Sequence, residues 1–580
     1  MTIAAPLNPD LPTSWLIPGI YISLDLTGAS SGLNNIAKRI LVVGHKTAAG
    51  IAALNTVVQL NGQGAANLWF GRGSDAARMF AAAQSQIGGG AADIYGVALP
   101  EPVGGAQSNH LITFIGTAQS AGAVDIIVCG YRATVPIANR DTPQILAANA
   151  VTAINALPDV PVLASAVGGA VWLTYRARGE LGNDLPVIVN FSGATGMKAS
   201  PGTIAFAGVA AGAGSTTVSV GATTVPVAVG DTETAAVVAA RVAAELNSDA
   251  YPCTADANAG TVTLYYAQDR VVHRIFARMF TTAGLTVSTA VGTLGTGRPL
   301  LTAALSNIAG QAVFPCWVSA FADPDSLGAI SNHIETEGNG RIQKDQQLFV
   351  VSTEALPDAG AIPVGTTPTL TSSPRYAVSW CQDSPQQGYE LAAREAARVC
   401  VEDYHPYNYD GEPLVTQGSV PLLLPHRNSR PGPDELNAAL RSYYLTPLAV
   451  DEQAGKLVIL RDRTTSNSTD DRLWAWGTIR TLAFYRYDLN AFLRSRFSRK
   501  NIKLHGTPRT PRTVTLTSIA DAIYERIRSW DNADLFDGVD DLKKQIQVSP
   551  NPYLTGRVDI FVPCRPPVKL DQLSGVAALI

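Results

Sequence analysis

The chain has 580 residues, which is too long for one hydrophobic core and predicts roughly three to four domains. It is 46% hydrophobic and only 16% charged, whereas an average soluble protein is about 25% charged, so we expect much of its surface to be buried in an assembly. The formal net charge of -4 excludes a general attraction to nucleic acid, because binding to phosphates depends on many Lys and Arg contacts.

Cysteine spacing and the amino-terminal residues both favour a protein made in a reducing cytoplasm. The cysteines show no Cys-x-x-Cys spacing, which predicts free thiols. The first eighteen residues hold no Lys or Arg and are interrupted by four prolines, so they lack the pattern of a secretory signal peptide. No stretch is long and apolar enough to predict insertion into a membrane. The cysteines are Cys129, Cys253, Cys316, Cys381, Cys400 and Cys564.

Residues 1–37 are predicted to form an extended amino-terminal arm. Prolines come first, then a strand at 20–26 with alternating apolar residues, then a link rich in Gly, Ser and Asn at 27–35. The strand has no evident local partner, so we expect it to exchange into the sheet of a neighbouring copy. Its candidate exchange residues are Ile20, Ile22, Leu24 and Leu26.

A discontinuous α/β core is predicted from two separate segments, 38–108 and 298–477. The apolar strand at 40–44 and the helix at 74–84 are typical of a parallel sheet layered with helices. The chain re-enters this core through apolar strands and an alanine-rich helix, at 313–318, 348–351 and 388–401.

The middle of the chain carries an internal repeat, with copies at 109–198 and 199–297. Val135-Pro136 recurs as Val225-Pro226 and Asp141-Thr142 recurs as Asp231-Thr232, at an offset of 90 residues. Asp141 or Thr142 is expected to cap the helix of the first copy, and Asp231 or Thr232 that of the second. Two copies are too few for a solenoid, so we expect a duplicated ββαβ domain inserted at an exposed place in the core.

A small α+β domain is predicted over 478–569, with helices at 482–496 and 519–530. Its basic residues come before its acidic ones in the sequence. Either a solvated surface or a complementary contact with a partner would explain this order. The partner-facing candidates are Arg499, Lys500, Lys503, Arg509, Arg512, Asp521 and Glu525.

Two strands are predicted at the carboxyl end, separated by a flexible proline-containing link at 563–569. Proline cannot donate a ladder hydrogen bond, so the link holds the final strand, 570–580, away from its own domain. We expect these strands to pair with a neighbouring copy. Their candidate exchange residues are Val558, Ile560, Leu573, Val576 and Leu579.

Catalytic motifs are incomplete. His505-Gly506-Thr507 is similar to the histidine motif of subtilisin-type proteases, but the matching nucleophile motif is missing, and one tripeptide does not define a triad. Gly71-Arg72-Gly73-Ser74 is not a nucleophile elbow, and Ser74 is expected to cap a helix. Gly44-His45-Lys46-Thr47 lacks the earlier glycine of a phosphate loop. We expect no enzymatic activity and no cofactor.

The histidines are scattered, which does not favour a metal site. His405 and His426 are not at ligand spacing. His333, Glu335 and Glu337 alternate as expected for a half-exposed segment, and we place no metal there.

Patterns at both ends of the chain lead to a family. At the carboxyl end, Arg557-Val558-Asp559 is followed by a proline, a short link and a final apolar strand; matching segments lie upstream at 443–451 and 456–461. Near the amino end stand Pro18-Gly19-Ile20-Tyr21-Ile22 and Phe70-Gly71-Arg72-Gly73-Ser74. Together these resemble the tail-sheath proteins of contractile-tailed bacteriophages, particularly the Mu-like branch. The resemblance covers the first hundred and the last two hundred residues.

The resemblance implies a structural subunit that stacks as hexameric rings around a tail tube and contracts to drive the tube through the bacterial envelope. It implies that 478–569 faces the tube and that the repeats project outward. The implied partners are neighbouring sheath subunits, the tail tube protein, and baseplate and tail terminator proteins. The implied location is the virion tail, after assembly in the host bacterial cytoplasm.

Two other classes of protein remain as alternatives. A secreted adhesin or surface-layer protein would share the Thr, Gly and Ala content but should carry a signal peptide. A hydrolase would need a convergent polar pocket, which no motif indicates.

Overall fold

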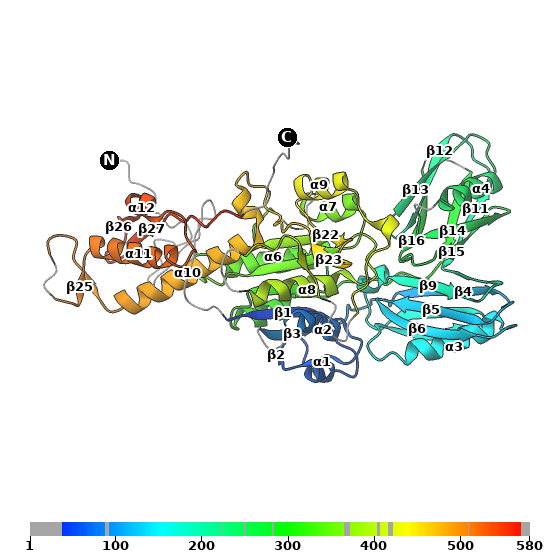
Figure 1. The fold of residues 1–580 in the computed structure, drawn as a ribbon, viewed down its shortest axis with the longest axis horizontal. Helices are drawn as coiled ribbons and strands as arrows, with labels where there is room; N and C mark the ends of the chain where they lie inside the picture. The colour runs from blue at the N-terminus through cyan, green and yellow to red at the C-terminus, as the bar shows by residue number, and fades with distance from the viewer. Residues whose placement is uncertain are drawn as a thin grey trace, which may run out of the picture.

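The computed structural model describes residues 37–87, 92–221, 223–248, 251–280, 284–364, 370, 372–402, 407–415, 421–507 and 510–569. The expected mixed α/β character, with several sheets, is confirmed. Figure 1 shows three parts along the longest axis: a carboxyl-terminal domain at one end, a large sheet covered by helices in the middle, and two smaller sheet-rich units at the other end.

A nine-stranded sheet forms the middle part, in the order β2-β3-β1-β18-β19-β20-β22-β23-β21. The six strands from β3 to β22 are parallel, and the strands at the two edges are antiparallel. The strands β18, β19 and β20 are buried along their whole length and mostly apolar, because both faces of the sheet are covered. The bounds are β1 (Arg39–His45), β2 (Val57–Leu60), β3 (Asp93–Leu99), β18 (Cys316–Ser319), β19 (Gln347–Ser352), β20 (Tyr376–Trp380), β21 (Glu412–Pro413), β22 (Thr446–Asp451) and β23 (Lys456–Ile459).

Helices cover this sheet, and their starts follow the local sequence. Ser74 caps α2 as predicted, because its Oγ accepts a hydrogen bond from the Ala77 amide at 3.2 Å. Asp323 caps α6 in the same way, 3.0 Å from the Ser326 amide. The alanine-rich helix α8 has the predicted bounds. The helices are α1 (Gln63–Phe70), α2 (Asp75–Ile87), α5 (Thr302–Ala309), α6 (Pro324–Glu337), α7 (Leu356–Val364), α8 (Gly388–Val401) and α9 (Pro433–Arg441), with short 3-10 turns η2 (Arg427–Ser429) and η3 (Asp471–Trp474).

The chain leaves the large sheet after β3 and returns to it at β18, and two units of the same fold lie between. The first contains β4 (Asn109–Gly116), β5 (Gly122–Val128), β6 (Tyr131–Ile137), α3 (Pro143–Asn155), β7 (Val162–Val167), β8 (Ala170–Tyr175), η1 (Glu180–Asp184), β9 (Val187–Ser192) and β10 (Met197–Ser200). The second contains β11 (Gly202–Gly208), β12 (Gly214–Val220), β13 (Thr223–Val229), α4 (Ala235–Leu246), β14 (Cys253–Asn258), β15 (Thr261–Tyr266), β16 (Ile275–Phe280) and β17 (Leu285–Ala290).

The predicted ββαβ unit is wrong in its strand content. Each unit has three strands, a helix and four strands, which form two sheets. The sheets are β10-β4-β8-β7 with β6-β5-β9 in the first unit, and β17-β11-β15-β14 with β13-β12-β16 in the second. The order of corresponding strands is therefore the same in both units.

The two helix caps correspond, but not at the residues that the sequence overlay paired. Thr142 caps α3, 3.5 Å from the Ile145 amide. The N-cap of α4 is Thr234, so the prediction of Asp231 or Thr232 is wrong. Thr232 instead occupies a turn with φ 63°, where Arg140 has φ 71° in the first unit. The strands before the helices and the caps themselves are 92 residues apart, so the overlay at 90 residues was two residues out of register here.

The carboxyl-terminal domain is built on α10 (Trp476–Phe497), which begins inside the core. The predicted domain start, Thr478, therefore lies within a continuous helix. The Arg486 guanidinium pairs with Asp345 and donates to the Gly338 carbonyl at 2.7 Å, which fixes the first half of α10 to the core. The remaining elements are β24 (Asn501–Ile502), β25 (Thr513–Val514), α11 (Leu516–Asp531), α12 (Val539–Leu542), η4 (Lys543–Gln545), β26 (Gln547–Pro550) and β27 (Val558–Phe561).

Candidate functional site: the carboxyl-terminal domain

The two last strands of the described chain form a hairpin in which β26 and β27 are antiparallel. The side chain of Asn551 holds the connection: its Oδ1 accepts from the Tyr553 and Leu554 amides, and its Nδ2 donates to Asp559 at 2.7 Å. The Arg557 Nε donates to the other oxygen of Asp559 at 2.8 Å. The first and last residues of the Arg-Val-Asp motif therefore stabilise the base of this hairpin.

Val558 and Ile560, which we expected to exchange with a neighbour, pair with β26 of their own chain. Within the described ranges this sheet has two strands, so its outer edges are not paired by a third. A two-stranded sheet is marginal alone, and an open edge is a template for another strand. Exchange through this edge stays a prediction. The other exchange candidates, Ile20, Ile22, Leu24, Leu26, Leu573, Val576 and Leu579, lie outside the described residues.

The link at 563–569, which we expected to be flexible, makes contacts with the rest of the chain. Pro563 and Pro566 are buried, and the Arg565 carbonyl accepts from the Asp537 amide at 3.0 Å. The Lys569 ammonium pairs with Asp410 and Asp462. Proline limits backbone donors but does not prevent packing against the domain, so the proline content gave no sign of these contacts.

The basic candidates gather at the end of the domain farthest from the core. Arg499 and Lys500 follow α10, Arg512 precedes β25, and all three side chains are exposed. Lys503 is half-buried and donates to the Thr507 carbonyl at 2.8 Å. Figure 1 shows β25 at this extreme end of the molecule. Arg509 lies outside the described residues.

The acidic candidates, Asp521 and Glu525, are exposed on α11. Glu525 pairs with Arg496 of α10 at 2.8 Å. Arg496 was not among the sequence candidates, although its position in the last turn of α10 placed it beside the basic residues that follow. The pair is largely exposed and contributes little to stability, but it lowers the net negative charge of this face.

The interior of the domain keeps α10 and α11 in one arrangement. Asp488 is fully buried and accepts hydrogen bonds from the Arg526 guanidinium and, at 2.9 Å, from the Trp530 indole. The Tyr485 and Trp530 rings stack with centroids 5.1 Å apart. A buried carboxylate with these donors is satisfied, so the domain has a rigid base for the hairpin and for its exposed charges.

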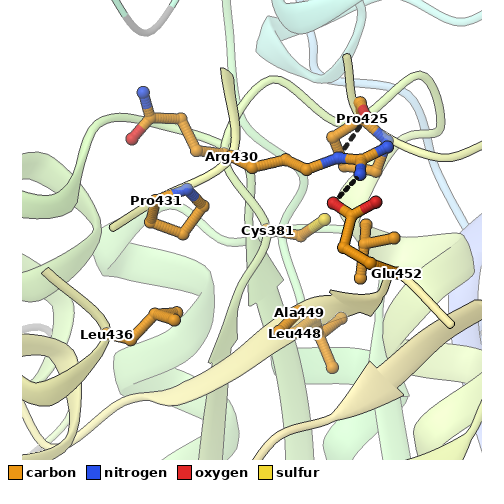
Figure 2. A pocket seen from close by; sticks show the side chains of 10 residues that line it. Cys381, Pro425, Arg430, Pro431, Leu436, Leu448, Ala449 and Glu452 are labelled. Atoms are coloured by element: carbon orange, nitrogen blue, oxygen red, sulfur yellow. Dashed lines mark hydrogen bonds and ion pairs between the residues drawn. The ribbon is translucent and has the colours of Figure 1, made fainter. Parts of the chain in front are cut away.

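A small pocket lies in the core between α9 and β22, and Figure 2 shows its lining. Its volume is about 140 Å³, and Leu436, Leu448 and two prolines make much of it apolar. Arg430 pairs with Glu452 and donates to the Pro425 carbonyl at 3.0 Å (Figure 2). Burial raises the pKa of the Cys381 thiol to about 12, which keeps this sulfur protonated and unreactive.

The remaining sequence candidates do not converge on a reactive centre. His45 lies 3.2 Å from Asp75, but both side chains are buried in a structural network. His333, Glu335 and Glu337 belong to helix α6, where His333 and Glu337 share one face and Glu335 is exposed on another. His405 lies outside the described residues, and His426 interacts with Arg270.

Three structural tests bear on the other classes of function. In the part of the chain that the structure describes, no group of three or more His, Cys, Asp or Glu side chains is placed to hold a metal ion. None of the helices among the described residues combines the length and apolarity needed to cross a membrane. All six cysteines are free thiols.

Comparison with known proteins points to one class, the sheath proteins of phage-like tails. The chain is 31% identical over 185 residues to a Mu-like prophage tail sheath protein of Haemophilus influenzae. The match spans 31% of this chain and 37% of the relative. No family model matches the chain. The expected resemblance to a Mu-like tail sheath protein is therefore confirmed.

Solved structures similar to this chain include two sheath tail proteins. The protein from Desulfitobacterium hafniense is 10% identical, with 92% of this chain and 93% of that chain covered and a TM-score of 0.39. The protein from Listeria innocua is 11% identical, with 80% and 78% covered and a TM-score of 0.33. TM-scores this low support no conclusion, so the function proposed below rests on the similarity in sequence to the Haemophilus influenzae protein.

Proposed function

We propose that this protein is a structural, non-enzymatic subunit of a contractile phage tail sheath. The observation that carries the proposal is the similarity over 185 residues to a tail sheath protein. The proposed location is the virion tail, after assembly in the host cytoplasm. Subunits would stack as hexameric rings around a tail tube, join baseplate and terminator proteins at the two ends of the tail, and contract to drive the tube through the envelope.

The open edges of the β26–β27 hairpin support strand exchange as the joint between subunits. Ordering an unpaired arm costs roughly 1 to 2 kcal/mol per residue, whereas each backbone hydrogen bond returns about 0.5 to 1.5 kcal/mol. Pairing alone therefore does not order an arm, and burial of apolar side chains must be added. Residues 20–26 and 570–580 carry such side chains, so arm ordering and polymerisation would be coupled.

The arrangement of the molecule supports an inside and an outside for the proposed sheath. The exposed basic residues Arg499, Lys500 and Arg512 lie at one end and the repeats at the other (Figure 1). The basic end would face the tail tube, where charge complementarity would set register and association rate more than affinity. The repeats would then project outward from the sheath.

Negative-stain microscopy of the purified protein tests the proposal. The full chain should form tubes or rings, in a contracted-like state because no tube is present as a template. A chain that ends at Lys569 should lose assembly while its apparent Tm changes little, since the removed residues belong to no predicted core element. A full-length protein that stays monomeric at high concentration and moderate salt contradicts the sheath function. A truncated chain that still assembles contradicts carboxyl-terminal exchange.

A further inference from the structure

The last described residue, Lys569, returns from the carboxyl-terminal domain to the core. Its ammonium is 2.7 Å from the Asp410 carboxylate and also pairs with Asp462. Only 13% of the Lys569 side chain is exposed, and the Asp462 side chain is completely buried. In Figure 1 the red segment after β27 runs back toward the orange segment that precedes α10, in agreement with these contacts.

Asp462 connects this lysine to the start of α10. Its second oxygen accepts from the Trp476 amide, the first residue of the helix, at 2.7 Å. An anion is favourable there because the first amides of a helix lack partners and carry partial positive charge. The Asp462 amide in turn donates to Asp410 at 3.0 Å. Both carboxylates are therefore held in place by backbone contacts of the core.

We propose that Lys569 is a positioning residue that clamps the root of the carboxyl-terminal arm to the core beside the first turn of α10. The arm at 570–580 would then leave the subunit from one fixed place on the core, rather than from the end of a free link after β27. The segment behind Lys569 agrees with this, because Pro563 and Pro566 are buried and Arg565 is hydrogen-bonded to Asp537.

The clamp has a consequence for assembly, which rests on the proposed strand exchange. A strand that starts from a fixed point has a higher effective concentration at a neighbour's hairpin than one on a loose tether. Because Asp462 also contacts the first turn of α10, a pull on the arm would reach the helix that joins core and carboxyl-terminal domain. Lys569 would thus act through the arm without touching the neighbour.

The test compares wild type with Lys569→Met, which keeps the side-chain length and removes the charge. Hydrogen exchange of the peptide 562–569 should be at least about tenfold faster in the variant, because a buried ion pair has lost one partner. The threshold concentration for assembly, measured by light scattering, should rise by at least about tenfold. Lys198→Met is the matched control, since the Lys198 pair with Asp256 is exposed and lies in the repeats.

A second variant separates positioning from simple stability. Lys569→Met leaves the buried Asp462 without its cation, whereas Lys569→Met combined with Asp462→Asn removes both charges of that pair and keeps an oxygen for the Trp476 amide. Asp410, whose side chain is 18% exposed, keeps its charge in both variants. The double variant should recover the Tm but not the assembly threshold. Recovery of both, or a single variant with wild-type exchange and threshold, overturns the clamp. Wild-type protein that never assembles would instead contradict the proposed function, and the exchange result would still decide the clamp.

Discussion

The two repeats are copies of one fold that are attached in different ways. Each copy has an equivalent asparagine at the end of its helix, and its side-chain amide binds the backbone N–H and C=O of one strand residue. Asn155 binds Ala164 in the first copy and Asn247 binds Ala255 in the second, at 2.8 to 2.9 Å. At the junctions the copies diverge. The tyrosine that ends β8 in the first copy, Tyr175, donates to Asp75 of the core at 2.6 Å. Its equivalent, Tyr266, makes a 3.4 Å contact with the Leu111 carbonyl of the first copy.

The junction of the first copy is a buried polar network. Arg78 of α2 pairs with Glu390 of α8 at 2.6 Å and donates to the Tyr389 hydroxyl at 2.8 Å. The Tyr175 hydroxyl joins the same group, 3.2 Å from Tyr389. Arg78 and Glu390 are at most 1% exposed, so this direct ion pair compensates two buried charges, and Arg394 also acts on Glu390.

The second copy contacts the core through charges of a different kind. His273 lies 3.5 Å from Asp383 in a buried pair, and Arg274 pairs with Glu354 at 2.7 Å with 34% of the Arg274 side chain exposed. A duplicated domain thus keeps its internal hydrogen bonds, while the junction residues determine where it sits. The first copy joins the core through a tyrosine hydroxyl that enters a buried network of core residues, and the second copy joins it through a titratable pair.

The largest expected effect comes from breaking the buried core ion pair that lies beside the first junction. Arg78→Met should lower the free energy of unfolding by about 3 to 5 kcal/mol, because the buried Glu390 would lose its direct ion-pair partner. Arg72→Met is the control: Arg72 joins the core to the first copy through Asp159 at 2.9 Å, but 54% of its side chain is exposed. Its loss should cost less than about 1 kcal/mol. If urea unfolding showed equal losses of unfolding free energy for Arg78→Met and Arg72→Met, burial of the Arg78–Glu390 pair would not explain its contribution to stability.

A smaller effect should separate the two equivalent tyrosines. Tyr175→Phe removes a donor from the buried Asp75 and should cost about 1 to 3 kcal/mol. Tyr266→Phe removes a long contact to a carbonyl and should cost about 0.5 kcal/mol or less. Thermal unfolding of both variants provides the measurement, and a larger loss for Tyr266→Phe would reverse the proposed ranking of the junctions.

Local sequence patterns were sufficient to predict those helices and strands whose structure is determined by residues close to them in the chain. The strand predicted at 40–44 lies within β1, and the helix predicted at 388–401 is α8. The repeat was visible from spacing, but its last strands were missed. Its overlay ended at Tyr175 and Tyr266, and the copies then differ, since η1 follows β8 only in the first. The misplaced cap at Asp231 or Thr232 has another cause: the overlay used an offset of 90 residues, whereas the caps Thr142 and Thr234 are 92 residues apart.

The candidate site was predictable only in part, because burial of a charge is decided by residues far away in sequence. The Arg-Val-Asp motif indicated the position of β27, and the exposed basic residues were identified. The contacts of Lys569 with Asp410 and Asp462 had no local signal, nor had the pairing of Arg78 with Glu390. A charged residue in sequence is expected at the surface, and only the fold shows which ones are enclosed.

The smallest expected effect is a pH dependence of the stability that the second junction contributes. Burial lowers the pKa of His273, but the Asp383 carboxylate, with Glu354 and Asp184 nearby, more than offsets this, so the pKa is raised above its ordinary value. A raised pKa means that the charged pair stabilises the fold fully below the unfolded-state pKa and that this contribution is lost as pH rises through the folded-state pKa. The Tm difference between wild type and His273→Gln should therefore shrink from about pH 5.5 to about pH 8.5. Arg78→Met should not show this decrease, because burial raises the pKa of Glu390 and the cost of leaving its carboxylate without Arg78 does not fall as pH rises. A difference for His273→Gln that is constant with pH would mean that this junction is held by packing rather than by the charged pair.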